Sequence, residues 1–286
     1  MKSNSNVSRI IELNIAMLFM STSGVLGRFI EMPPPLTIWW RCLLAAVFLG
    51  LFCWNQKIDL SIRHKKDLTI VLVGGLFLGG HWVTYFFALQ YSSVAIGMLS
   101  LFTYPAITAF LEPIILKTRF KMSHILSAII VIVGIYLLAP NLSLENNYTK
   151  GIVLGLLSAF LYSLRNLLLK DRAKNYHGST LMFYQMLIVV LALTPVWISC
   201  NDHEVDYQWP ALITLALITT AVGHTLFVIS FKHFSISTAS IMSSIQPIYG
   251  ILLGIVFLNE VPGLSTAFGG ALILATVVIE SVRSFK

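Results

Sequence analysis

Long apolar runs separated by short polar connections dominate the chain. A helix needs roughly 20 mostly apolar residues to cross the hydrocarbon core of a bilayer. Ten segments fit this pattern: 10–30, 36–54, 68–89, 94–117, 122–140, 151–169, 179–199, 208–231, 236–258 and 265–283. Several connections carry turn signals, such as the prolines at 33–35 and the Asn-Glu-Val-Pro-Gly sequence at 259–263. The pattern predicts an all-α integral membrane protein with ten transmembrane helices.

Composition excludes a soluble domain. Of the 286 residues, 57% are hydrophobic and 11% are charged, and the mean hydropathy is +0.82, whereas soluble domains carry about 25% charged residues. The first apolar run lacks a small-residue cleavage site, so we interpret it as a transmembrane helix and not as a cleaved signal. The chain is therefore expected to be a multi-pass protein embedded in the lipid bilayer.

Motifs for cofactor, metal or nucleotide chemistry are not found in the sequence. It contains no P-loop, no HExxH and no GxSxG. The three cysteines, Cys42, Cys53 and Cys200, follow no metal-ligand spacing and are expected to behave as small hydrophobic residues. We expect no cofactor, no bound metal and no nucleic-acid partner, because the net charge of +7 is explained by membrane topology.

The distribution of positive charges indicates how the protein is oriented in the membrane. Ten spans place both termini on one side, and Lys and Arg accumulate in cytoplasmic loops. With the N-terminus inside, Arg28 and Lys150 face the opposite side, and the cytoplasmic side receives Lys2, Arg9, Lys57, Arg63, Lys65, Lys66, Lys117, Arg119, Lys121, Lys170, Arg172, Lys174, Lys232, Arg283 and Lys286. The sequence thus predicts a protein of the cell (inner) membrane with both termini in the cytoplasm.

The two halves of the chain match after a shift of 142 residues. Residues of the same kind then coincide: Pro105 with Pro247, Ser123 with Ser265, Arg28 with Lys170, and Ser21 with Ser163. The halves, 1–145 and 146–286, each hold five predicted spans, and an odd number requires opposite orientations. Inverted repeats of this kind are a transporter architecture, in which the substrate site lies near the membrane midplane between the halves.

The order and duplication of these motifs resemble the drug/metabolite transporter superfamily, in its EamA-type branch. The resemblance rests on two Pro-centred segments, SLFTYPAITAFLEPI at 100–114 and SSIQPIYGILLGIVFLNE at 243–260, on the Arg of IWWRCLLAA, and on the Gly-Ala-Leu-Ile sequence at 270–273. It implies a bundle of two inverted five-helix EamA-like repeats that exports metabolites or amino acids. The family often has an acid just after each Pro-centred helix; Glu260 matches, but Thr118 stands at the first place.

Two prolines interrupt apolar segments at equivalent positions. Pro105 and Pro247 each remove a backbone donor and open the helix by roughly one turn. In lipid, such a break is tolerated only where protein or a wet cavity satisfies the freed carbonyl group. The kinks either line or gate a pathway, or are packing kinks retained after duplication. Tyr104 and Gln246 lie beside them and are candidate substrate ligands.

Three charged residues, Glu112, Arg165 and Arg41, lie within predicted spans and require partners. Glu112 lies five residues before Lys117, about 7.5 Å of helix rise from the cytoplasmic end. Arg165 lies at a similar depth, so the sequence predicts a Glu112–Arg165 pair with either a structural or a proton-coupling role. Arg41 lies in the outer third of the second span with no acid at its level. It is expected to meet carbonyl groups, water or a substrate anion, or to hold helix ends together.

Two histidines mark a candidate central site. His81 and His224 follow small residues near the middle of the third and eighth spans, one residue off the repeat offset. Trp82 and Tyr85 share this neighbourhood and could pack on an aromatic body. With few charges nearby, the site suits an uncharged or zwitterionic substrate with an apolar body. The predicted substrate-binding set is His81, Trp82, Tyr85, Tyr104, His224, Gln246 and Arg41.

The sequence favours a secondary transporter, and not an enzyme, that exports small metabolites, amino acids among them, by alternating access. A channel-like facilitator of the same fold is an alternative. An integral-membrane enzyme is another alternative, but it would need an acid–base constellation at one depth, and the sequence offers none that is convincing.

The topology can be tested by labelling introduced cysteines with a membrane-impermeant reagent in intact cells. Cysteines at positions 65 and 172 should be protected, and cysteines at positions 202–206 should react, because the cations lie overwhelmingly on the proposed cytoplasmic side. External labelling at position 65 would refute the orientation.

Overall fold

A computed structural model describes residues 2–116, 123–138, 143, 145–200, 208–234, 239 and 242–284, and within these ranges every regular element is helical. The α-helices are α1 (Lys2–Phe29), α2 (Pro34–Asn55), α3 (Lys65–Tyr91), α4 (Val94–Leu101), α5 (Tyr104–Leu116), α6 (Ser123–Leu138), α7 (Asn147–Leu169), α8 (Arg172–Asn175), α9 (Gly178–Ser199), α10 (Trp209–Thr214), α11 (Thr225–Ser230), α13 (Gln246–Leu258) and α14 (Leu264–Ser284). Two elements have other helical geometries: η1 (Leu215–His224) is a π-helix and η2 (Ser243–Ile245) is a 3₁₀-helix.

Apolar helices fill the predicted positions. In the described part of the chain, seven helical stretches are long and apolar enough to cross a membrane: Ser8–Phe29, Pro34–Asn55, Lys65–Tyr91, Val94–Ile115, Asn147–Leu169, Gly178–Ser199 and Trp209–Ser230. Three shorter apolar helices, Ile129–Leu138, Ser243–Leu258 and Leu264–Thr276, lie at the fifth, ninth and tenth predicted spans. Large apolar side chains such as Leu191, Ile198 and Val256 point outward, as expected for a surface in contact with lipid. The protein is therefore a multi-pass helical membrane protein.

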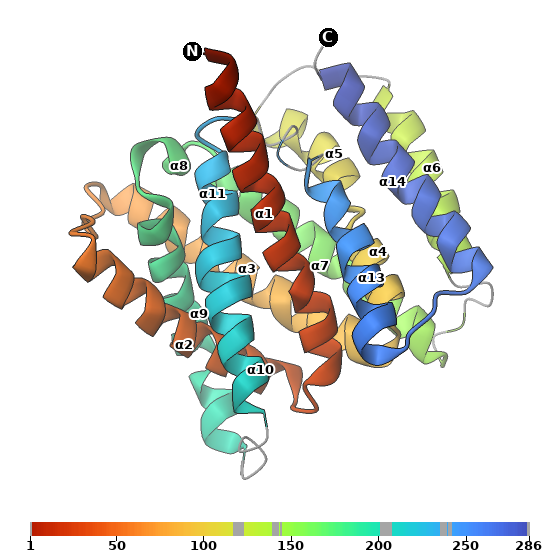
Figure 1. The fold of residues 1–286 in the computed structure, drawn as a ribbon, viewed down its shortest axis with the longest axis horizontal. Helices are drawn as coiled ribbons and strands as arrows, with labels where there is room; N and C mark the ends of the chain where they lie inside the picture. Colours follow the sequence, from red (N-terminus) through yellow and green to blue (C-terminus); the bar gives the residue numbers. More distant parts are fainter. Residues whose placement is uncertain are drawn as a thin grey trace.

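The helices form one bundle with a central layer and two flanking pairs (Figure 1). The pair α6 and α14 packs together at one edge, and the pair α2 and α9 packs together at the other. Between them, α1 packs against η1 and α13, and α3 packs against α7. Helix α1 begins and α14 ends at the same end of the bundle, as Figure 1 shows.

Both prolines highlighted by the sequence follow a break in a helix. The predicted span 94–117 divides at Phe102 and Thr103, and Pro105 is the second residue of α5. In the other half, η2 precedes α13, and Pro247 is its second residue. Proline fits the first turn of a helix because its missing N–H group has no intrahelical partner there.

The two breaks touch, and side chains satisfy the backbone around them. The Tyr104 hydroxyl hydrogen-bonds the Ser243 hydroxyl and so joins the first break to the second. The Ser163 hydroxyl donates to the Tyr104 carbonyl oxygen over 3.0 Å, and the Thr103 hydroxyl donates to the Ser100 carbonyl oxygen over 2.8 Å. Protein groups therefore supply the hydrogen bonds that lipid cannot.

The eighth predicted span is continuous but changes its helical register. Helix α10 passes into the π-helix η1, which ends at His224, and α11 follows. The Thr220 hydroxyl donates to the carbonyl oxygen of Leu215, five residues earlier, over 2.9 Å. Local π-helical geometry is frequent at functional sites, and η1 carries Thr220 and His224, which belong to the central polar region described next.

Candidate functional site

A small cavity lies in the middle of the bundle, among aromatic and polar side chains. Its volume is about 20 Å³, which is room for about one water molecule. Its lining consists of Met20, Ser23, His81, Trp82, Tyr85, Leu101, Phe102, Tyr104, Tyr162, His224 and Gln246. The structure thus brings together the predicted set His81, Trp82, Tyr85, Tyr104, His224 and Gln246, from both halves of the chain.

His81 is held in one tautomer by α7. Its Nδ1 atom lies 2.7 Å from the Ser158 hydroxyl oxygen, and the Ser158 hydroxyl donates its proton to the His81 carbonyl oxygen over 2.8 Å. Since a hydroxyl has one proton, Nδ1 of His81 must be the donor to Ser158, and Nε2 is left as an acceptor. The Tyr162 ring stacks on the imidazole at a centroid distance of 4.4 Å.

His224 approaches the same cavity from η1. Its ring meets Trp82 edge-on at a centroid distance of 5.1 Å, and the Trp82 and His81 rings are 6.5 Å apart. The Nδ1 atom of His224 is buried and has no hydrogen-bond partner in the described part of the chain. Trp82 therefore links the two histidines.

Arg41 lies behind this lining and is fully buried. Its Nε atom donates to the Thr220 hydroxyl over 2.7 Å, and its Cζ atom lies 3.9 Å from the centroid of the Trp82 ring. The Nη1 and Nη2 atoms have no hydrogen-bond partner among the described residues. Of the predicted substrate ligands, Arg41 alone does not line the cavity; it contacts the lining residue Trp82.

The predicted Glu112–Arg165 pair is wrong. Oε1 of Glu112 accepts a hydrogen bond from Nζ of Lys170 over 3.0 Å. Arg165 instead points at α9 and donates from Nε to the Gln185 side-chain oxygen over 3.0 Å. Five residues of α-helix rotate a side chain by about 140°, so Arg165 and Lys170 leave different faces of the helix. The depth of Arg165 was a poor guide because the sequence does not show which face meets α5.

A second ion pair closes the opposite end of the bundle. Nε of Arg28 lies 2.9 Å from Oε1 of Glu260, and Nη1 of Arg28 donates to the Gln90 carbonyl oxygen over 2.8 Å. The other Glu260 oxygen accepts from the backbone N–H of Val94 over 2.8 Å. Glu260 thereby caps the N-terminus of α4, where a negative charge is favourable.

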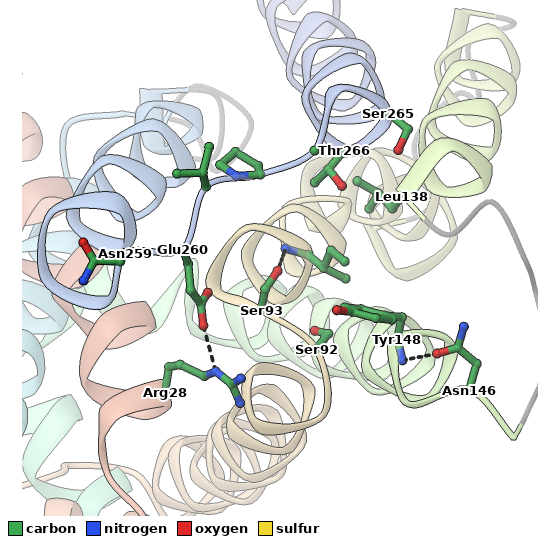
Figure 2. Close-up of a pocket in the computed structure, with 14 residues that line it drawn as sticks. Arg28, Ser92, Ser93, Leu138, Asn146, Tyr148, Asn259, Glu260, Ser265 and Thr266 are labelled. Atoms are coloured by element: carbon green, nitrogen blue, oxygen red, sulfur yellow. Dashed lines mark hydrogen bonds and ion pairs between the residues drawn. The ribbon is translucent and has the colours of Figure 1, made fainter.

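These residues border a larger, open pocket of about 580 Å³. Figure 2 shows Glu260 reaching from the segment after α13 toward Arg28, with Ser92 and Ser93 beside it and Asn146 and Tyr148 across the pocket. Sequence reasoning had singled out Arg28 and Glu260 separately, for the repeat and for the family resemblance. It did not pair them, and it missed Ser158 and Tyr162, although both are polar residues within an apolar run.

Metal chemistry finds no support in the described part of the chain, where no group of three His, Cys, Asp or Glu side chains could hold a metal ion. Cys42 and Cys53 are buried free thiols.

A profile of the EamA-like transporter family matches the chain at residues 9–139 and again at 149–282. The chain belongs to the EamA-like transporter family. Over 98% of its length it is 25% identical to the uncharacterized transporter YxxF of Bacillus subtilis, of which 92% is covered. It is also 20% identical to the pseudopaline exporter CntI of Pseudomonas aeruginosa, with 92% of this chain and 93% of that protein covered.

A solved crystal structure shares the fold. It superimposes with a TM-score of 0.72 at 17% sequence identity and covers 97% of both chains. The family and the fold agree with a membrane transporter, and neither identifies the substrate.

Removing either central histidine should impair transport by this EamA-like protein. His81→Ala and His224→Ala should each reduce the transport rate about tenfold or more with little loss of folded protein, because each imidazole would form one hydrogen bond with the bound substrate, and losing such a bond to a buried polar group costs roughly 1–3 kcal/mol. His64→Ala is the control, since His64 is exposed at the start of α3. Normal transport by both histidine variants across a substrate panel would show that the pair is only packing.

Proposed function

We propose that this protein is a secondary transporter that exports small metabolites, amino acids among them, across the inner membrane by alternating access. The observation that carries the proposal is the closed polar cavity in the middle of the bundle, lined by residues of both halves of the chain. Membership of a transporter family supports a transporter over an enzyme. The relative named as a pseudopaline exporter supports the outward direction.

The proposed mechanism needs two inverted halves, 1–145 and 146–286. Two separate family matches, one in each half, support this division. The packing of the helices agrees with an exchange of the halves: α1 packs on η1 and α13, while α7 packs on α3 and α4. The position of both chain ends at one end of the bundle agrees with cytoplasmic termini (Figure 1). A pseudo-two-fold axis in the membrane plane would then pass near the central cavity.

The two ion pairs take equivalent places in this scheme. Arg28 and Lys170 coincide under the repeat offset of 142 residues. Their acids do not coincide under this offset, but Glu260 follows α13 and Glu112 lies in the C-terminal part of the equivalent helix α5. Glu112 thus supplies the acid that the first half lacks at Thr118, which lies outside the described residues. In the predicted orientation, the Arg28–Glu260 pair is outside and the Lys170–Glu112 pair is inside.

We infer that these pairs close the two ends of the pathway. The side chains are 22–35% exposed, and ion pairs near water contribute about 0–1 kcal/mol. Such pairs can break without a large barrier, so each end can open in turn. With both pairs formed and a cavity of about 20 Å³, the arrangement is the one expected of an occluded state, which an alternating-access carrier has and an open channel-like facilitator lacks.

Transport by the purified protein in proteoliposomes tests this function. Candidate substrates come from a metabolite screen of the medium around over-expressing cells. Uptake should saturate and should accelerate when the vesicles are preloaded with the same compound, because a carrier returns faster with substrate bound. A parallel assay with an imposed pH gradient reports proton coupling. Uptake that rises linearly with concentration and shows no acceleration by preloading would contradict alternating access.

A further inference from the structure

Two arginines lie inside the bundle without a carboxylate. Arg41 on α2 and Arg165 on α7 are both 0% exposed. A guanidinium group does not lose its proton in proteins. No Asp or Glu occurs among the buried polar side chains that the structure describes. The described interior therefore holds two positive charges and no negative one.

The groups that contact these arginines are neutral. Arg41 has one hydrogen bond, to Thr220, and cation–π contacts to Trp82 at 3.9 Å and to Phe86 at 5.7 Å. Arg165 donates to the side-chain oxygens of Gln185 and Asn166. Neutral partners satisfy hydrogen bonds but do not cancel a charge, and an uncompensated charge inside a membrane protein is costly. The protein therefore contains two such unfavourable buried charges.

Both arginines lie next to the lining of the central cavity. Arg165 is one helical turn after Tyr162, a lining residue on the same helix α7. Arg41 stacks on Trp82, another lining residue. Unused donors lie beside Arg165: the side-chain nitrogens Nδ2 of Asn166 and Nε2 of Gln185 are buried and have no hydrogen-bond partner among the described residues. Such a site suits a ligand that accepts hydrogen bonds and carries negative charge.

Arg41 has the geometry to be the anchor. Its two terminal nitrogens lack hydrogen-bond partners in the described part of the chain, whereas Nε, Nη1 and Nη2 of Arg165 all have contacts. Two parallel N–H donors match the two oxygens of a carboxylate. Stacking on Trp82 and the bond from Nε to Thr220 fix the plane of the guanidinium group.

We propose that the transported substrate carries a carboxylate, which Arg41 binds when the cavity opens, while Arg165 adds a second positive charge. The substrate class is therefore organic acids, amino acids included, and uncharged compounds are excluded. Trp82, Tyr85 and Tyr162 provide aromatic surface for the rest of the molecule. This inference rests on the central site of the proposed function and narrows the sequence-based expectation of an uncharged or zwitterionic substrate to one that carries a carboxylate.

Thermal unfolding of the purified protein tests the charge requirement without any transport. Matched acids and amides serve as probes: phenylacetate against phenylacetamide, L-phenylalanine against L-phenylalaninamide, and succinate against succinamide, all in chloride-free buffer. Because a ligand of the native state raises the midpoint of unfolding, at least one acid should raise it by several degrees while its amide does not. Arg41→Gln should abolish this shift, and Arg63→Gln, which removes an exposed arginine between α2 and α3, should retain it.

The comparison of acid with amide needs only the wild-type protein, so it remains decisive if Arg41→Gln does not fold. Equal shifts by acids and amides, or no shift by any acid, would overturn the inference. Stabilisation by added chloride but by none of the acids would also overturn it, because the two arginines would then bind an inorganic anion and not a substrate carboxylate. If a neutral compound is transported equally by the wild-type protein and by Arg41→Gln, the carboxylate inference fails and the proposed transporter function stands. If acids bind but no compound is transported, the carboxylate inference stands and the proposed transporter function fails.

Discussion

The scarcity of hydrogen-bond partners inside a membrane is the constraint on which the rest of this structure depends. Lipid offers none, so the backbone groups freed where a helix is interrupted must find their partners within the protein. The breaks before Pro105 and Pro247 meet through Tyr104 and Ser243. In the π-helix η1, the Thr220 hydroxyl donates to the Leu215 carbonyl oxygen and accepts a hydrogen bond from Nε of Arg41. The irregular segments are therefore gathered where the polar cluster can satisfy them.

The same constraint explains why the ends of the bundle differ from its centre. The central charges have only neutral partners, and they persist because the surrounding helices hold them. The ion pairs at the two ends are partly exposed and join true opposite charges, Arg28 with Glu260 and Lys170 with Glu112. Weak pairs near water suit surfaces that separate and close again, whereas a costly site in the interior suits a ligand that completes it.

Much of this architecture follows from the sequence, because hydrophobic length and proline position act locally. Among the described residues, seven long apolar helices and three shorter ones lie at the positions of the predicted segments, and the two segments with a central proline are the interrupted ones. The partners of Glu112 and Arg165 could not be predicted, since depth follows from residue number but the face of a helix depends on its neighbours. The π-helical register of η1 also leaves no mark in a pattern of apolar residues. His81 and His224 could be found because each interrupts an apolar run at a nearly repeated position.

The central claim is that one cavity is reached alternately from the two sides of the membrane. Ser23 lines that cavity, so Ser23→Cys, in a protein whose natural cysteines are replaced, can report access by a membrane-impermeant maleimide. The account predicts labelling in both right-side-out and inside-out vesicles, with Glu260→Gln raising access from outside and lowering it from inside, and Glu112→Gln doing the opposite. Labelling from one side only, or equal changes in both directions, would contradict it.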